Sequence, residues 1–127
     1  MSSCVLDASA ALAVLKGEPG GGTVLSSGLA PQISTVNLAE VYGRLIQLGM
    51  QGSPAWEAAH TIADEIVPFT QTQARLTAEL FPRTRSLGLG LGDRACLALG
   101  IERKLPVLTA DKAWKALRLG VEIRVIR

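Results

Sequence analysis

The stretch CVLDASAALAVLK, residues 4–16, contains two patterns that meet at one aspartate. Its first three residues form a short apolar run typical of a buried strand, and the alanines and leucines of residues 8–16 favour a helix. Asp7 therefore lies at the carboxyl end of a strand and directly before a helix. Ligands bind at this end of the strands in open α/β sheets. The sequence thus places a carboxylate where a binding site is expected.

The alternation of strand and helix continues along the chain. Further short strands are expected near residues 32–33 and over 65–69, 106–109 and 121–126. Helices are expected over residues 34–48, 54–64, 70–86, 93–104 and 112–118, with Pro82 breaking the third of them. Such alternation predicts one domain over residues 1–127, a three-layer α/β/α fold with a central, mainly parallel sheet.

Composition excludes several classes of protein. A hydrophobic fraction of 48% and a mean hydropathy of +0.30 indicate a folded chain rather than a disordered one. There is no apolar run of about 18 residues, and the first residues lack a basic region and contain Asp7, so neither a membrane span nor an export signal is predicted. We expect a cytoplasmic protein.

The cysteines and the histidine also narrow the chemistry. Cys4 and Cys96 are too few for a disulfide framework or a zinc site, so both are expected as buried thiols. His60 is the only histidine and has no adjacent serine or cysteine nucleophile, which argues against a hydrolase with a catalytic triad.

Charge is unevenly distributed. Residues 1–63 contain two basic and four acidic residues, and residues 64–127 contain eleven basic and seven acidic residues, so the halves carry −2 and +4. A basic half beside acidic residues suits a polyanionic substrate, and ordinary solvated side chains explain the charge equally well. On this basis Arg83, Arg85 and Arg94 are candidate contacts for a nucleic acid.

Four acidic residues interrupt otherwise apolar surroundings: Asp7, Glu40, Asp93 and Asp111. Gathered carboxylates oppose one another's ionisation, and a cation offsets this repulsion. An all-oxygen site suits Mg²⁺ or Mn²⁺, which can activate water for attack on a phosphodiester. We therefore predict these four residues as a catalytic metal site.

Small polar residues accompany the acids and would support them. Ser9 follows the first acid by two residues, Asn37 precedes the second by three, and Thr109 precedes the fourth by two.

Each acid also has an ordinary structural interpretation. Asp93 could stabilise a helix start, and Glu40 could pair with Arg44 at four-residue spacing. Asp7 and Asp111 could be turn residues at strand ends.

Taken together, the acids lie in four motifs that resemble one known family. The motifs are VLDASAAL at 5–12, STVNLAEV at 34–41, LGLGDRACLALG at 89–100 and VLTADKAW at 107–114. In this order they resemble a PIN-domain ribonuclease, and more narrowly a VapC-type toxin of a type II toxin–antitoxin system. They span nearly the whole chain.

The resemblance implies a specific activity and specific partners. Asp7, Glu40, Asp93 and Asp111 match the family's acidic metal-binding residues, and the three small polar residues match its supporting positions. The implied activity is Mg²⁺- or Mn²⁺-dependent endoribonuclease cleavage of a structured RNA. The implied partners are an RNA substrate, a second copy in a homodimer and a cognate VapB-like antitoxin.

One segment departs from the family pattern. Relatives usually carry a helix-forming sequence where this chain has Gly20-Gly21-Gly22. We therefore do not expect the second helix of the family to be well formed here.

Two other functions fit the same residues. A metal-dependent phosphatase also uses aspartates at strand ends, but Asp7 has no second aspartate two residues later, as an aspartyl-phosphate enzyme normally would. A non-catalytic module that binds metal or RNA would keep the acids without the reaction. The glycines at 88, 90 and 92 do not fit G-x-G-x-x-G and are expected as a flexible approach to Asp93.

Overall fold

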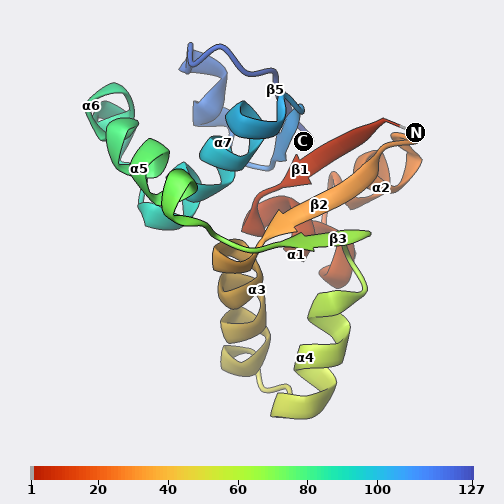
Figure 1. Ribbon diagram of the computed structural model, residues 1–127. Coiled ribbons are helices and arrows are strands. Elements are labelled where there is room, and N and C mark those ends of the chain that lie inside the picture. The colour runs from red at the N-terminus through yellow and green to blue at the C-terminus, as the bar shows by residue number, and fades with distance from the viewer. Residues whose placement is uncertain (1) are drawn as a thin grey trace.

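The computed structural model describes residues 2–127, so Met1, the first residue of the expected domain, lies outside the described part. Five strands form one sheet: β1 (Ser3–Leu6), β2 (Ala30–Ser34), β3 (Glu65–Val67), β4 (Val107–Thr109) and β5 (Ile123–Val125). Seven α-helices surround it: α1 (Ala8–Lys16), α2 (Gly21–Ser26), α3 (Thr35–Gln47), α4 (Gly52–His60), α5 (Gln71–Glu79), α6 (Phe81–Thr84) and α7 (Leu91–Arg103). Two short 3-10 helices are η1 (Arg85–Leu87) and η2 (Lys112–Ala116). Figure 1 shows α3 and α4 as a helical hairpin that extends away from the sheet.

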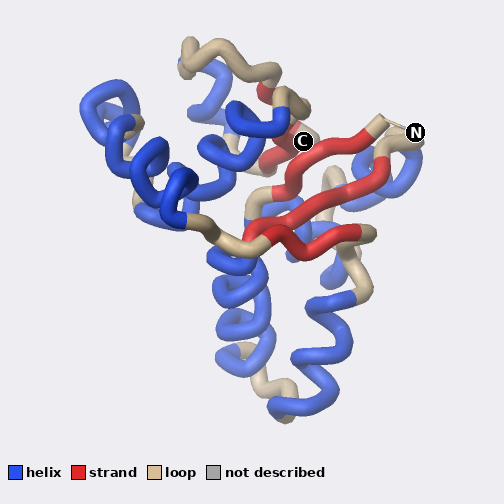
Figure 2. The backbone as a smooth tube through the Cα atoms, in the orientation of Figure 1, coloured by secondary structure: helices blue, strands red, loops and turns tan. Residues whose placement is uncertain are grey.

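All described strand pairs are parallel, and their order is β3-β2-β1-β4-β5 (Figure 2). The chain therefore adds strands on one side of β1 first and then returns to add β4 and β5 on the other side. The order reverses between β1 and β4, which is the position where doubly wound sheets bind ligands. Asp7 and Asp111 follow these two strands, so the topology brings both carboxylates to the switch point.

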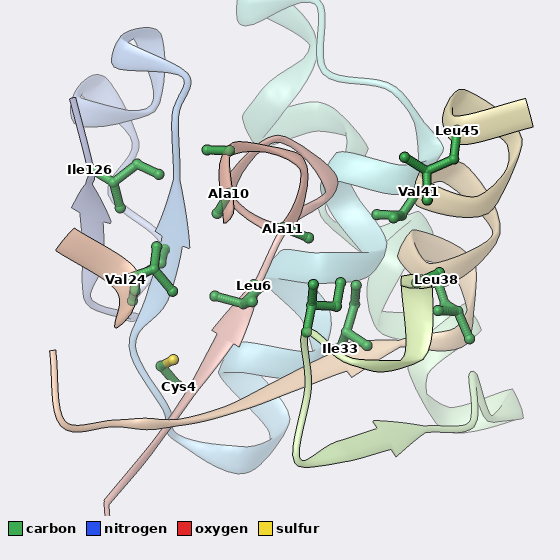
Figure 3. Close-up of a cluster of buried hydrophobic side chains, with 14 of the residues drawn as sticks. Cys4, Leu6, Ala10, Ala11, Val24, Ile33, Leu38, Val41, Leu45 and Ile126 are labelled. Carbon is green, nitrogen blue, oxygen red and sulfur yellow. The ribbon is translucent and has the colours of Figure 1, made fainter. Parts of the chain in front are cut away.

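The sheet is buried on both faces. On one face, β1 contributes Cys4 and Leu6 to a core that includes Ile33 and side chains of α1 to α4 (Figure 3). On the other face, Val5 and Val107 pack with α7 and with Trp114 of η2. Strands covered on both faces are continuously apolar, which is why β1 shows no polar alternation. The predicted three-layer α/β/α fold is confirmed.

Helix starts follow the side chains that cap them. Asp7 accepts a hydrogen bond from the Ala10 backbone N–H and caps α1, and Ser34 accepts one from the Val36 N–H and caps α3. Each cap satisfies a backbone donor that has no partner inside the helix. These two helices begin where the sequence predicted them.

Several predicted bounds were wrong. Helix α4 begins at Gly52 and ends at His60, earlier at both ends than the expected 54–64. The short helix expected over residues 112–118 is the 3-10 helix η2, which ends at Ala116, and β5 is limited to Ile123–Val125. Short elements such as these are set by packing more than by propensity.

The expectation for the glycine tract was also wrong, because α2 forms from Gly21. Gly21 is buried against α1, where an added Cβ would lie 2.5 Å from the Ala13 carbonyl oxygen. Gly20 has a φ of +95°, which favours glycine. The tract therefore lets two helices approach closely rather than preventing the second one.

Substitution at two adjacent glycines tests this packing. Gly21→Ala should lower the free energy of unfolding by about 1–3 kcal/mol, because the methyl group would be forced against backbone. Gly22→Ala is the matched control, since nothing lies within 4 Å of its Cβ position, and it should raise stability by about 0.4–1 kcal/mol. Urea unfolding measures both changes, and equal effects at the two positions would contradict the close approach.

The remaining predictions about single residues can be compared with the structure. Cys4 and Cys96 are buried free thiols, as expected. His60 contacts the Trp56 carbonyl oxygen through Nδ1 at 2.7 Å and lies edge-on to the Trp56 ring. Among the described residues, no helix is both long enough and apolar enough to cross a membrane.

Candidate functional site

The carboxylate of Asp7 lies at the switch point, and this residue is only 4% exposed. Its Oδ1 accepts hydrogen bonds from the Ala10 N–H at 2.8 Å and from Ser9 Oγ at 2.7 Å. Its Oδ2 accepts one from Thr109 Oγ1 at 2.6 Å. Donors from β4 and from α1 therefore fix the plane of this carboxylate.

The same hydroxyl groups connect Asp7 to Asp111. Thr109 Oγ1 accepts a hydrogen bond from the Asp111 N–H at 3.1 Å, and Ser9 Oγ accepts one from the Ala110 N–H at 2.9 Å. The Ser9–Ala110 bond, like the Thr109–Asp7 bond, links residues about one hundred positions apart in the chain. Asp111 itself is exposed, and its Oδ1 accepts from the Ala113 N–H at 3.0 Å as the cap of η2.

A second group of contacts joins α3 to the start of α7. Asn37 is buried, and its Nδ2 donates both to Glu40 Oε1 at 2.8 Å and to the Gly92 carbonyl oxygen at 2.9 Å. The Glu40 carboxylate lies against Gly92, where an added Cβ would be 2.5 Å from Glu40 Cδ and still closer to both carboxylate oxygens. A side chain at residue 92 would therefore displace the exposed end of Glu40 from this position.

Sequence analysis missed Gly92 as a site residue. It was expected in a flexible approach, whereas it is buried within the first turn of α7. The sequence feature that could have identified Gly92 is its position directly before Asp93. Its contact with Glu40 depends on the packing of α3 against α7, which no local pattern reports.

Asp93 is half-buried in the first turn of α7, and its Oδ2 accepts a hydrogen bond from the Gly90 N–H at 3.0 Å. This bond matches its structural interpretation as a helix-start residue. The alternative for Glu40 is not seen, because Arg44 donates to Gln47 at 2.7 Å instead.

Three of the acids act electrostatically on one buried thiol, and Asp93 also acts on Asp7. Burial raises the pKa of Cys96 well above its usual value, and the charges of Asp7, Asp93 and Glu40 raise it further. Burial also raises the pKa of Asp7, with the charge of Asp93 acting in the same direction and the hydrogen bonds from Thr109, Ala10 and Ser9 opposing it. Asp7, Glu40 and Asp93 therefore lie in one electrostatic neighbourhood.

The chemistry of these donors fits a hard divalent cation. All of them are carboxylate oxygens, and the raised pKa of Asp7 reports that the protein alone does not fully stabilise its charge. Within residues 2–127, no three or more His, Cys, Asp or Glu side chains are gathered closely enough to hold a metal ion together. Mg²⁺ typically takes one or two carboxylates and retains several waters.

The pKa of Asp7 predicts how stability depends on pH. The folded metal-free protein binds the Asp7 proton more tightly than the unfolded chain, so the free energy of unfolding should fall as pH rises above about 4, the ordinary carboxyl pKa. Urea unfolding in EDTA between pH 4 and neutrality measures this decline. Asp7→Asn should show a shallower decline, and an identical pH slope for both proteins would contradict the prediction.

The three predicted RNA-binding arginines lie in different surroundings. Arg83 and Arg85 are exposed on α6 and η1. Arg94 is half-buried: its Cζ lies 5.2 Å from the centroid of the Phe81 ring, and its Nη1 donates to the Thr77 carbonyl oxygen at 3.4 Å. The guanidinium of Arg94 therefore packs between α7 and the α5–α6 segment.

Comparison with known proteins gives one family and several similar structures. The sequence model of the PIN domain matches residues 4–119. No curated protein sequence matches significantly. The structure is similar to DNA-bound VapBC from Salmonella typhimurium, with 15% identity, complete coverage of both chains and a TM-score of 0.74.

Two other solved structures are similar to nearly the same extent. VapBC2 from Rickettsia felis, bound to a DNA fragment from its promoter, has 16% identity over 97% of this chain and 98% of that chain, with a TM-score of 0.72. VapC20 from Mycobacterium tuberculosis, a toxin that cleaves the sarcin–ricin loop, has 17% identity over 94% and 99%, with a TM-score of 0.71. At these identities the likeness concerns the fold.

Proposed function

Because the chain belongs to the PIN domain family, we propose that it is a divalent-metal-dependent endoribonuclease and the toxin of a type II toxin–antitoxin pair. The observation that carries the proposal is the buried carboxylate of Asp7 at the switch point, with Glu40 and Asp93 in the same electrostatic neighbourhood. A buried carboxylate with like charges nearby is costly unless it serves a bound cation.

Asp7 and Asp93 are proposed to hold Mg²⁺ or Mn²⁺, with Glu40 and Asp111 completing the acidic set. When bound, such an ion lowers the pKa of a water and offsets negative charge on the phosphoryl oxygens. Either ion suits these oxygen donors.

The protein's own contribution is orientation. Ser9 and Thr109 each donate to Asp7 and so hold its carboxylate in one plane. Asn37 holds Glu40 against the start of α7 and thereby sets its separation from Asp93. Donors that orient acids in this way are expected to affect metal affinity or activity by about 10- to 100-fold.

The proposed partners follow from the similar structures. Several of these are VapBC complexes, and some contain DNA. We propose that this chain likewise binds a VapB-like antitoxin, forms a homodimer and acts on RNA.

The test is cleavage of labelled total RNA by the purified protein in Mn²⁺, Mg²⁺ or EDTA. We expect cutting with either ion and none in EDTA. Asp7→Asn, purified in parallel, exposes contaminating nucleases. Cutting that survives EDTA or Asp7→Asn would overturn the proposal, and metal binding without any cutting would favour a non-catalytic binding module.

A further inference from the structure

Most basic residues of the chain that lack an ion pair lie in two neighbouring segments. Lys16, Arg75, Arg103, Arg124 and Arg127 all pair with glutamates. Within the described residues, the basic side chains without such a partner are Arg44, Arg83, Arg85, Arg94, Lys104, Lys112, Lys115 and Arg118. Seven of these eight lie within residues 83–118.

A hydrogen bond from a side chain of one segment to the backbone of the other joins the two segments. Arg83 of α6 donates through Nη2 to the Arg118 carbonyl oxygen, just after η2. Arg118 in turn donates through Nη1 to the carbonyl oxygens of Lys115 at 2.8 Å and Leu117 at 2.9 Å. Figure 1 shows α6 and the chain between β4 and β5 at the same end of the molecule, away from the α3–α4 hairpin.

We call the four exposed side chains Arg83, Lys112, Lys115 and Arg118 the basic ridge. The ridge begins beside the acids, because Lys112 directly follows Asp111, the cap of η2. The Asp111 N–H donates a hydrogen bond to the Thr109 hydroxyl group, which in turn donates to Asp7 and orients it. The ridge is therefore continuous with the candidate site.

A pocket of about 510 Å³ lies along the ridge. Its lining residues fall between Trp114 and Ile123 and include Lys115 and Arg118. Exposed basic side chains that have no acidic partner in the protein can bind a polyanion, whose negative charges would then pair with them.

We propose that the phosphate backbone of the RNA substrate runs along the basic ridge from the acidic site, with Lys112 and Lys115 as phosphate contacts. This inference rests on the proposed function for the identity of the polyanion. The proposed contacts do not include Arg94, which the sequence predicted as an RNA-binding residue. The guanidinium of Arg94 already packs on Phe81 and donates to the Thr77 carbonyl oxygen.

Binding of a fluorescein-labelled poly(U) RNA oligonucleotide in EDTA, titrated at several salt concentrations, tests the ridge without cleavage. The variant is Lys112→Gln/Lys115→Gln, since neither side chain has a described hydrogen bond and the fold should be preserved. The matched control is Arg75→Gln/Lys104→Asn, which removes the same charge from exposed positions outside the ridge. Asparagine suits residue 104 because its φ is +56°.

We expect the ridge variant to bind more weakly and to lose about 1.4 from the slope of log affinity against log salt, about 0.7 for each phosphate contact. The control should keep nearly the full slope. Equal losses of slope in both variants would show that net charge alone governs binding. An unchanged slope in the ridge variant would contradict the proposed phosphate contacts, and so would an absence of RNA binding by the native protein. Metal-dependent cleavage is scored separately, so the nuclease can stand if the ridge fails.

Discussion

Asp93→Asn is expected to lower the rate of RNA cleavage by more than about 100-fold while the protein stays folded. Even residues that only support metal ligands change activity by about 10- to 100-fold, so loss of a direct ligand should exceed that range. The readout is the initial rate of cleavage of a defined RNA in Mn²⁺.

Stability should respond in a different way. The charge of Asp93 raises the pKa of Asp7, so its removal favours the ionised Asp7 in the metal-free protein. Against this, α7 loses a carboxylate in its first turn, which costs about 0.3–1 kcal/mol. The free energy of unfolding in EDTA should therefore change by no more than about 1 kcal/mol.

Asp64→Asn is the matched control, because Asp64 is an exposed aspartate directly before β3, at the amino end of an edge strand, whereas the candidate site lies at the carboxyl ends of β1 and β4. It should cleave RNA at the native rate. Full activity of Asp93→Asn would remove this residue from the catalytic set, and an unfolded variant would show that its role is structural.

Gly92→Ala is expected to reduce activity with little change in stability. Its new methyl group would overlap the Glu40 carboxylate, and this exposed end of the side chain would move away and give up its hydrogen bond from Asn37. Loss of that bond costs about 0.5–1.5 kcal/mol and the higher helix propensity of alanine offsets about 1 kcal/mol, so the free energy of unfolding should change by no more than about 1 kcal/mol. The cleavage rate should fall about 10- to 100-fold.

Two further variants separate this contact from a general effect of alanine. Gly43→Ala lies on the same helix as Glu40 with nothing within 4 Å of its Cβ position, and it should be harmless or stabilising. In a Glu40→Ala background, Gly92→Ala should cause little further loss of cleavage rate, because the overlapping carboxylate is absent. Additive effects of the two substitutions would contradict the proposed overlap.

These variants also distinguish the two kinds of support in the site. Ser9 and Thr109 act on Asp7 from α1 and β4, whereas Asn37 and Gly92 act on Glu40 where α3 meets α7. A defect at Gly92 should therefore leave the pH dependence of stability that arises from Asp7 largely unchanged.

The sequence by itself determined the parts that depend on near neighbours. The apolar run before Asp7 and the helix-forming residues after it predicted β1 and α1, and Asp7 caps that helix as local hydrogen bonding requires. The alternation of such units was sufficient for the three-layer fold. Because acids at strand ends converge in any such sheet, the position of Asp7 could also be predicted before the structure.

Tertiary structure decided what depends on contacts between distant residues. The strand order brings Thr109 to Asp7, and the packing of α3 on α7 places Glu40 against Gly92, a contact that spans more than fifty positions. Likewise, Arg94 was expected at an RNA surface but packs on Phe81. Propensity and capping act over a few residues, whereas these pairings depend on the volume and shape that remain once the layers have closed.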